Sequence, residues 1–333
     1  MSNEIKLAHG GGGILMQELI RENIVPALKS KSLMELADSA RLDVDNISLA
    51  FTMDGFVVDP LIFPGGDIGR LAVCGTINDL AARGARPLAL SLGLIIEEGL
   101  CLEIFRQIMD SVARTAREAD VEVVTGDTKV VERGSASGIF ITTSGVGQMR
   151  RDMDFGPDRI AAGDVVIING YIGDHGIAVM SLREGISFVS TVKSDVAPLA
   201  EMVGKVLDMC GPAVKCMKDP TRGGLAANLN EIARKVGILL EEDKIPVRNQ
   251  VRGACELLGL DVLSVANEGK MLFVVSEKEA QKALEALNNH PLGRDAAIIG
   301  RVDDKAGLVR LKTSIGGERI IDTPYGEELP RIC

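Results

Sequence analysis

The sequence predicts a mixed α/β (α+β) protein of two domains that ends in a mobile C-terminal tail. The chain has 333 residues, and domains average roughly 150 residues, so two domains are expected. Patterns typical of strands and of helices alternate in both halves, which favours a mixed architecture in each. A polar stretch over 150–163 contains two glycines and a proline and shows little periodicity. We therefore expect domains at 1–155 and 156–314, followed by a tail at 315–333.

The first half predicts a glycine-rich arm and then alternating helices and strands. Four consecutive glycines at 10–13 have too much backbone freedom for a regular element, so we expect a mobile arm there. Apolar spacing predicts helices over 14–29, with a kink or end near Pro26, and over 68–81 and 104–116. Apolar runs predict strands over 48–53, 89–96, 121–124 and 138–144. The strand at 121–124 is expected to open into a loop at 125–129.

The second half continues this alternation. Residues 165–168 form a continuous apolar run typical of a buried strand, and a turn with spaced glycines and a helix are expected after it. From residue 315 onward the sequence shows no periodicity, which predicts a tail without regular structure. Helices are also expected near 198–209, 223–236 and 277–287, and strands near 238–242, 271–275, 296–302 and 307–312.

Composition excludes several classes of function. Hydrophobic residues make up 46% of the chain and charged residues 25%, which is the balance of a soluble globular protein. A net charge of −10 offers no basic field to nucleic-acid phosphates or to an anionic membrane. No apolar run approaches the roughly 18 to 20 residues of a membrane span, and residues 1–6 lack the features of a signal peptide. We expect a cytoplasmic protein with free thiols, because the six cysteines contain no CxxC pair.

Three carboxylates suggest a nucleotide site. Asp54, Asp67 and Asp127 each stand where an apolar run breaks. Strand ends are where α/β folds place ligands, and carboxylates with few basic neighbours suit Mg²⁺ bridged to nucleotide phosphates. No P-loop motif is present, and the glycines at 170, 173 and 176 miss the dinucleotide fingerprint. Asp67 has a structural alternative as the N-cap of the helix that follows it.

A fourth carboxylate, Asp79, limits what one ion can bind. It lies twelve residues beyond Asp67 on the same expected helix, which places it about 18 Å further along the axis. If the helix is continuous, the two side chains of one chain cannot share an ion. Either the site holds more than one metal, or a second subunit contributes, or one of the two is structural.

Other candidates also have structural alternatives. Lys129 either reaches a phosphate, acts as an acid or base, or is a surface lysine. The segment 219–224 precedes an apolar helix whose first amides can hold an anion, or it simply caps that helix. His9 is ambiguous, and the surroundings of His175 are typical of a solvated loop histidine. Residues 267–270, taken alone, predict a turn.

The last residue, Cys333, stands apart from the other cysteines. It follows a stretch rich in proline and glycine, and ten extended residues reach about 33 Å. A thiol on such a tail can be loaded by one protein and unloaded by another. The alternative is an accidental terminal cysteine, and no prenylation box is present because nothing follows Cys333.

Six segments, taken together, resemble the HypE family of hydrogenase maturation proteins. They follow one another in the family's order along essentially the whole chain. The C-terminal segment is the most specific, because the wider superfamily of aminoimidazole ribonucleotide synthetases, selenophosphate synthetases and thiamine-phosphate kinases shares the aspartate blocks but not that ending. The segments are 8–13, 63–73, 125–131, 173–176, 219–223 and 330–333.

The resemblance implies a fold, partners and a reaction. It implies two domains of the aminoimidazole ribonucleotide synthetase type, an ATP site made largely by the N-terminal domain, and a homodimer paired through those domains. HypF would place a carbamoyl group on Cys333, and this chain would dehydrate the thiocarboxamide to a thiocyanate with ATP. The cyano group would then pass to iron on the HypC–HypD complex and become a ligand of the [NiFe]-hydrogenase centre.

The resemblance also implies residue roles. Phosphorylation turns the carbamoyl oxygen into a good leaving group, while Mg²⁺ neutralises the triphosphate. Cys333 would carry the substrate, and Lys129 and Glu268 would remove the two N–H protons. The implied magnesium ligands are Asp54, Asp67, Asp79, Asp127 and Asp219. The implied nucleotide-binding residues are Asp54, Asp67, Asp79, Asp127, Thr128 and the arm, made of His9, Gly10, Gly11, Gly12 and Gly13, which would close over the phosphates and exclude water.

Two alternatives remain at this point. One is another ATP-using enzyme of the superfamily, such as a small-molecule kinase or a selenophosphate synthetase. The latter is expected to carry a reactive cysteine near the N-terminal glycines, and none of residues 1–73 is a cysteine. The other alternative is a non-enzymatic carrier that presents Cys333 and binds nucleotide only as a switch.

Overall fold

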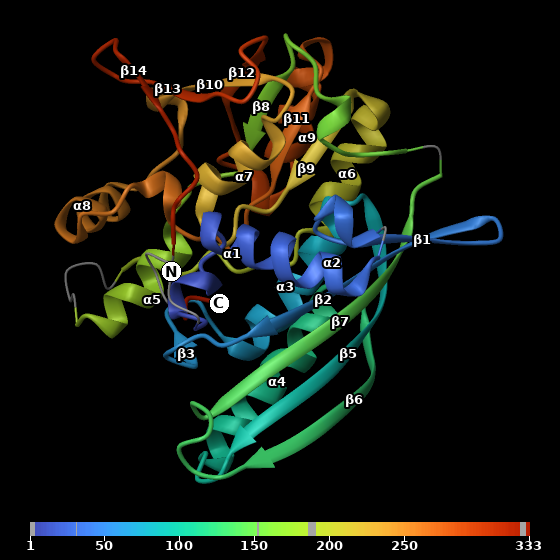
Figure 1. Cartoon of the computed structure of the whole chain (residues 1–333), viewed down its shortest axis with the longest axis vertical. Coiled ribbons are helices and arrows are strands. Elements are labelled where there is room, and N and C mark those ends of the chain that lie inside the picture. The colour runs from blue at the N-terminus through green and yellow to red at the C-terminus, as the bar shows by residue number, and fades with distance from the viewer. Residues whose placement is uncertain (1–3, 31, 152, 186–190, 327–330) are drawn as a thin grey trace.

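A five-stranded sheet and a seven-stranded sheet form the framework of the protein (Figure 1). The structure is a computed structural model, and it describes residues 4–30, 32–151, 153–185, 191–326 and 331–333. The mixed α/β class that the sequence predicts is confirmed. No helix in these described ranges has both the length and the apolar character needed to cross a bilayer.

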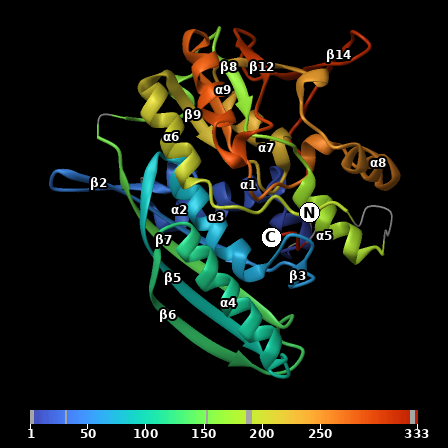
Figure 2. The same ribbon diagram turned by 180° about the vertical axis from the view of Figure 1, so that it is seen from behind.

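Residues 40–149 build the first sheet and the two helices that cover one of its faces (Figure 2). The strands are β1 (Ala40–Val44), β2 (Ile47–Phe56), β5 (Ala85–Glu97), β6 (Glu122–Val131) and β7 (Ile139–Met149), and the helices are α3 (Ile68–Ala82) and α4 (Leu102–Glu118). A short hairpin, β3 (Ile62–Phe63) and β4 (Gly66–Asp67), precedes α3. The strand order is β1-β2-β7-β5-β6. Only β5 and β6 run parallel, because α4 provides the crossover between them.

The predicted loop at 125–129 is wrong. These residues belong to β6 and pair with β5 from Ser91↔Thr125 onward. The turn-forming residues there predicted a break, but the neighbouring strand supplies hydrogen bonds that keep the backbone extended. β6 is therefore a long strand at the edge of the sheet, and nine of its ten residues are exposed.

Helix α3 runs through the middle of the molecule and is buried almost all round. Thirteen of its fifteen residues are buried, because it contacts the first sheet, α4 and a helix of the second half. Asp67 begins the helix as its N-cap: one carboxylate oxygen accepts hydrogen bonds from Gly69 N at 2.8 Å and Arg70 N at 2.9 Å. The helix is continuous, so Asp67 and Asp79 lie near its opposite ends.

The second sheet lies between two layers of helices. Its strands are β8 (Val165–Ile168), β9 (Val214–Lys218), β10 (Gly237–Glu241), β11 (Leu272–Val275), β12 (Ala297–Asp303), β13 (Val309–Lys312) and β14 (Glu318–Ile320), in the order β14-β13-β10-β12-β8-β11-β9. The helices of this half are α5 (Asp174–Arg183), α6 (Ala200–Cys210), α7 (Gly224–Ile232), α8 (Asn249–Leu258) and α9 (Ala280–Asn288). Alternate residues of β8 pack toward α7 on one face and toward α6 and α9 on the other. This explains why the strand reads as a continuous apolar run.

The N-terminal arm is helical for most of its length. It comprises η1 (Leu7–Gly10), α1 (Ile14–Leu19), a π-helical turn η2 (Ile20–Ile24), α2 (Val25–Leu28) and η3 (Ser32–Glu35). The helix predicted over 14–29 is confirmed apart from that π turn, and it ends where Lys29 adopts a left-handed conformation. Of the four glycines, Gly10 closes η1 and the other three form irregular bends.

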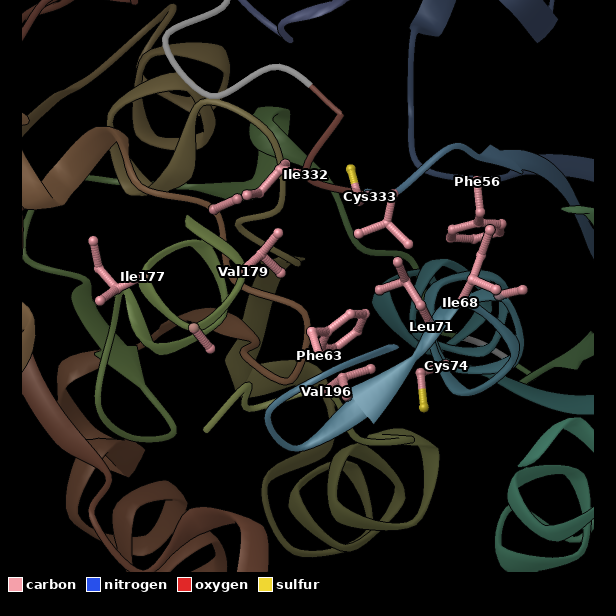
Figure 3. Packing of buried hydrophobic residues seen from close by; sticks show 14 of the residues in the cluster. Phe56, Phe63, Ile68, Leu71, Cys74, Ile177, Val179, Val196, Ile332 and Cys333 are labelled. Atoms are coloured by element: carbon pink, nitrogen blue, oxygen red, sulfur yellow. The ribbon is translucent and has the colours of Figure 1, made fainter. Parts of the chain in front are cut away.

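The C-terminal segment differs from the predicted tail. The prediction that the chain has no regular structure from residue 315 onward is wrong for 318–320, which form β14 against β13. The last two residues, Ile332 and Cys333, are buried in a core cluster that both halves of the chain build. Figure 3 shows them between Ile177 and Val179 of α5 on one side and Phe56 and Ile68 on the other. Pro330, which belongs to the terminal motif, lies outside the described residues.

Candidate active site

Three carboxylates from three different elements meet beside the first sheet. Asp54 stands in β2, Asp79 in the last turn of α3 and Asp219 directly after β9. The side chains of Asp54 and Asp79 are hydrogen bonded to each other, and Thr52 Oγ1 donates to Asp79 Oδ2 at 2.7 Å. Two carboxyl groups share a hydrogen bond only when one of them is protonated. The cluster therefore favours a bound cation, which would let both groups ionise.

Burial and mutual repulsion raise the pKa of all three carboxyl groups. For Asp54 burial is the largest cause, and the nearby Arg222 guanidinium opposes it. For Asp79 repulsion from Asp54 and Asp219 adds to the effect of burial, which raises its pKa well above the usual value. Burial is again the main reason for the raised pKa of Asp219. A divalent cation would reverse these shifts, because it stabilises the ionised form of its ligands.

A cavity of about 600 Å³ opens beside these carboxylates, between the arm, β2 and α7. This volume lies in the usual range for a small-molecule site. Asn228 of α7 lines the cavity and is 6% exposed, and its Oδ1 has no hydrogen-bond partner among the described residues. An orphaned buried acceptor of this kind fits a donor group on a ligand. The lining also includes Gly12, Met16, Gln17, Arg21, Asp38, Asp54, Asp79, Lys218, Asp219, Arg222 and Glu231.

Gly12 brings the arm against this cavity. Its φ of +74° belongs to the left-handed region that favours glycine. A Cβ atom built at this position would lie 2.9 Å from both Cβ and the backbone oxygen of Arg222. The close packing of the arm on the loop before α7 therefore requires glycine at position 12.

The last residue of the chain lies beside Glu268, next to the carboxylate cluster. Cys333 is 8% exposed and Glu268 is 3% exposed, and the Glu268 carboxyl group lies close enough to the thiol to raise the pKa of Cys333 further. Burial raises the pKa of the Cys333 thiol to about 12. Burial, with repulsion from Asp195 and Asp219, raises the pKa of Glu268 well above its usual range. Glu268 Oε1 has no hydrogen-bond partner in the described part of the chain, so this carboxyl group keeps an unused acceptor beside the thiol.

Hydrogen bonds to the backbone hold the last three residues in place. The carbonyl oxygens of Arg331, Ile332 and Cys333 all accept hydrogen bonds from residues of the two halves. The donors are Asp59 N at 3.1 Å and Arg183 Nη2 at 2.9 Å for the first, His175 Nε2 at 2.8 Å for the second, and Val57 N at 3.2 Å for the third. The terminus is therefore docked like a short strand, with its thiol near Glu268.

A buried ion pair fixes the turn that carries Glu268. Asp195 Oδ2 lies 3.0 Å from Lys270 Nζ, and the two side chains are 4% and 10% exposed. The Asp195 carboxylate also accepts hydrogen bonds from Glu268 N at 3.1 Å and Gly269 N at 3.2 Å. From the other side, Asn78 of α3 donates to Glu268 O at 3.2 Å. The backbone of Glu268 is thus tied to elements of both halves.

Comparisons with known proteins identify the family of this site. Residues 36–149 match the model "AIR synthase related protein, N-terminal domain", and residues 161–311 match the corresponding C-terminal domain. The carbamoyl dehydratase HypE of Bradyrhizobium diazoefficiens is 48% identical over 332 residues, which cover 99% of this chain and 96% of that protein. The chain belongs to the HypE family.

Solved structures of HypE proteins share its fold. In a crystal structure of a HypE–HypF complex, the similar chain is 46% identical, covers 92% of this chain and 99% of its own length, and has a TM-score of 0.87. A HypE crystallised with ATP is 43% identical, covers 99% of this chain and all of its own, with a TM-score of 0.83. The fold that the resemblance to this family implied is confirmed.

The structure brings together the side chains of five of the fourteen residues to which the HypE resemblance gave a role. Asp54, Asp79 and Asp219 line the cavity, and Glu268 and Cys333 lie near these carboxylates without lining it. Asp67 is not among them, because its carboxylate caps the far end of α3. This is the structural alternative that the sequence left open.

The candidates at positions 127–129 lie on β6, the exposed edge strand of the first sheet. Asp127 Oδ2 and Lys129 Nζ are 2.6 Å apart, and their side chains are 71% and 67% exposed. Thr128 donates its amide to Asp127 at 2.9 Å. None of the three lines the cavity. Figure 1 shows β6 on the outer side of the first sheet, away from the C-terminus.

The arm residues divide in a similar way. Gly12 lines the cavity, whereas His9 accepts a hydrogen bond from Lys6 N at 3.0 Å in the exposed turn η1. Gly13 packs so closely on the C-terminal segment that a Cβ there would meet Pro324 O at 2.1 Å. The arm therefore contacts both the cavity and the segment that leads to the docked terminus.

The carboxylate cluster fits a magnesium ion that arrives with a nucleotide. Within the described ranges, no group of three His, Cys, Asp or Glu residues is close enough to form a ready-made metal cage. Mg²⁺ in nucleotide sites commonly uses one or two carboxylates, with phosphate oxygens and waters as its other ligands. Asp54, Asp79 and Asp219 can supply the protein's share of that set.

Several residues of this site were missed by the sequence analysis. Asp195 and Lys270 form the ion pair behind Glu268, and Arg222 lies near the Glu268 carboxyl group and the Cys333 thiol. Asn78 offered one signal, because it is a polar residue at a buried position of an apolar helix. The sequence offered no signal for Asp195, since it follows no periodic element and its hydrogen-bond partners lie more than seventy residues away.

Proposed function

We propose that this chain is an ATP-dependent carbamoyl dehydratase that converts a thiocarboxamide on Cys333 into a thiocyanate during hydrogenase maturation. One observation carries the proposal: the terminal thiol is docked beside Glu268, next to a carboxylate-lined cavity of nucleotide size. The near full-length identity to carbamoyl dehydratases of the HypE family supports it. A selenophosphate synthetase or a small-molecule kinase would have no use for a buried terminal thiol at this place.

The reaction needs the carbamoyl oxygen to leave. ATP transfers its γ-phosphoryl group to that oxygen, the C–O bond then breaks with phosphate as the leaving group, and the nitrogen loses two protons as the C≡N bond forms. The products are the thiocyanate, ADP and phosphate. Mg²⁺ held by Asp54, Asp79 and Asp219 would neutralise charge on the triphosphate during transfer.

Glu268 is the proposed proton acceptor within the chain. When the sulfur carries a carbamoyl group, it no longer offers a thiol proton to Glu268. The carboxylate then faces the carbamoyl N–H with a free acceptor oxygen. Its raised pKa makes it a stronger base than an exposed glutamate, which suits removal of an amide proton.

We propose that Lys129 acts in the site of a second copy of the chain. β6 is a ten-residue edge strand that exposes Val123, Val124 and Val130, and long exposed edges invite pairing. We propose a homodimer in which first sheets associate at this edge, so that Asp127, Thr128 and Lys129 of one chain approach the nucleotide of the other. Within one chain Lys129 does not lie in the same site as Glu268. The proposed dimer would bring Lys129 to that site from a second chain.

The proposed partners follow from the chemistry of the tail. HypF would load the carbamoyl group onto Cys333, a role consistent with the solved HypE–HypF complex. The HypC–HypD complex would accept the cyano group at iron. All of these steps are proposed to occur in the cytoplasm.

Mass spectrometry of the intact chain tests the reaction directly. After incubation with HypF, carbamoyl phosphate and ATP, the wild-type chain should gain a carbamoyl group and then lose the mass of one water. Cys333→Ala should gain nothing, and Glu268→Gln should stop at the carbamoyl adduct. A carrier without enzymatic activity would keep the carbamoyl adduct in the wild type, and that result would reject the proposal.

Mixed dimers test the shared site. Cys333→Ala and Lys129→Ala chains are each expected to be inactive alone. If the site combines two chains, random pairing of equal amounts restores about one competent site in four. If the site lies within one chain, the mixture stays inactive.

A further inference from the structure

His175 is a buried histidine that the proposed reaction does not use. The sequence is typical of a solvated loop at this position, but the residue lies in the first turn of α5 and is completely buried. Its ring meets the Phe63 ring edge-on, with 5.4 Å between centroids. Both ring nitrogens have partners, Ser194 Oγ at 2.8 Å and Ile332 O at 2.8 Å.

The partners determine which nitrogen carries the proton. A carbonyl oxygen only accepts, so Nε2 must donate to Ile332 O. Nδ1 of the neutral ring then accepts from the Ser194 hydroxyl. Ser194 Oγ also accepts a hydrogen bond from Val196 N at 3.1 Å, which leaves its own proton for His175. Burial lowers the pKa of His175, which agrees with a neutral ring.

Ser194 is itself held in place by the hairpin before α3. Its amide donates to Pro64 O at 2.7 Å. Gly65 has a φ of +95°, and a Cβ there would lie 2.8 Å from both N and O of Ser194. The chain of contacts therefore runs from the hairpin of the first half, through Ser194 and His175 of the second half, to the carbonyl of Ile332.

We propose that His175 is a positioning residue that fixes the backbone register of the docked terminus and so places the Cys333 sulfur at Glu268. The inference rests on the proposed function, in which that sulfur carries the substrate. A slip of one residue would move the sulfur by about 3.3 Å, which is beyond hydrogen-bond reach of Glu268. Among the described residues, His175 is the one side chain that donates a hydrogen bond to Ile332 O.

Three substitutions separate the hydrogen bond from the volume of the ring. His175→Phe keeps an aromatic ring but removes the donor, whereas His175→Gln keeps an N–H group at nearly the place of Nε2. Ser194→Ala removes the group that orients the ring. His290→Phe is the matched control, because His290 is also buried but contacts Leu292 and Glu201 in the second half.

The first readout is the rate at which iodoacetamide alkylates Cys333 at pH 8, followed by peptide mass mapping. The docked thiol is buried and has a raised pKa, so it reacts only from the undocked state. Loss of one hydrogen bond should raise the undocked fraction, and hence the rate, about tenfold in His175→Phe. His175→Gln should stay within about twofold of wild type, and Ser194→Ala should fall between the two. The exposed Cys101 and the buried Cys74 should react at wild-type rates in every variant, which controls for reagent access and unfolding.

The second readout is single-turnover loss of water from the carbamoylated chain. It should slow about tenfold in His175→Phe and recover in His175→Gln. A wild-type alkylation rate in a folded His175→Phe, or equal rates for His175→Phe and His175→Gln, would overturn the proposal. If His175→Phe does not fold, a wild-type rate in Ser194→Ala would overturn it. The alkylation result does not depend on catalysis, so a chain that never loses water would reject the proposed function and leave the docking role standing.

Discussion

Neutralising substitutions at two neighbouring buried carboxyl groups, Glu268 and Asp195, should change the free energy of unfolding in opposite directions. The pKa of Glu268 is raised well above the usual 4.5 by burial and by repulsion from Asp195. A group whose folded pKa exceeds its unfolded pKa contributes stability below the unfolded value, and this contribution is lost as the pH rises through the folded value. Glutamine does not ionise, so Glu268→Gln should unfold with a larger free energy than wild type at pH 8.

The magnitude follows from what surrounds the carboxylate. Glu268 is 3% exposed, and its Oε1 has no hydrogen-bond partner in the described structure. An ionised side chain that is buried without a partner costs at least as much as an unpaired polar group, about 1–3 kcal/mol, and glutamine removes that charge. We therefore expect Glu268→Gln to gain about that much at pH 8, and we expect the gain to shrink toward zero as the pH falls toward 4.5.

Asp195 provides the opposite case in the same network. Burial opposes its ionisation, but Lys270 and the backbone amide of Glu268 favour it and help to lower its pKa below the usual 3.8. Its stabilising contribution is present above the unfolded pKa and is lost as the pH falls through the folded pKa. Asp195→Asn also leaves Lys270 buried without its partner, which costs about 3–5 kcal/mol.

Urea unfolding of the nucleotide-free protein in EDTA, at several pH values between 4.5 and 8, measures both effects. Two spectroscopic probes should be used, so that free energies are compared only where their transitions coincide. A loss of stability in Glu268→Gln at pH 8 would refute the reasoning. Such a loss would mean that ionised Glu268 is stabilised in the folded state, with Arg222 as the charged group that opposes its raised pKa.

Three further predictions concern the other candidate residues. Asp54→Asn should weaken Mg·ATP binding about 10–100-fold in calorimetry, the range for a lost metal contact, and unchanged affinity would make Asp54 structural. Asp67→Ala should lower the free energy of unfolding by about 1 kcal/mol without changing that affinity, and weaker binding would contradict its assignment as a helix cap. Lys129→Ala should change the free energy of unfolding by no more than about 0.5 kcal/mol, because its ion pair is exposed. The same variant should accumulate the carbamoyl adduct, and normal water loss would remove its proposed role.

Sequence patterns predicted the fold best where one element decides its own structure. α4 has a clear apolar face, and β8 is a short continuous apolar run, so both were expected within a few residues of their bounds. β6 failed because its second half is held by pairing with β5, which no local pattern reports. β9 and α8 were missed for a related reason. β9 is short and carries lysines at its two half-buried positions, and α8 follows a segment without a clear start signal.

The site shows the same division between local and long-range information. Asp219 and Cys333 lie in two of the six segments that resemble the HypE family, and the same resemblance implied roles for Asp79 and Glu268. The contacts that hold these residues in place join distant parts of the chain. His175 and Ile332, for example, are 157 residues apart. Sequence spacing cannot reveal such a contact, which is why the sequence predicts a solvated loop histidine at position 175.

The docked terminus is held by contacts that leave its sulfur free for chemistry. The hydrogen bonds reach the carbonyl oxygens of the last three residues, and the Ile332 side chain fills an apolar site. A carbamoyl or cyano group on the sulfur changes none of these contacts, so the same docking mode suits each stage of the reaction.

Loading differs, because a buried thiol with a pKa of about 12 is a poor nucleophile. We therefore infer that HypF loads the undocked terminus, whereas water is lost from the docked one. His175→Phe should then speed loading by HypF while it slows water loss, and a parallel decrease in both rates would contradict this order of events.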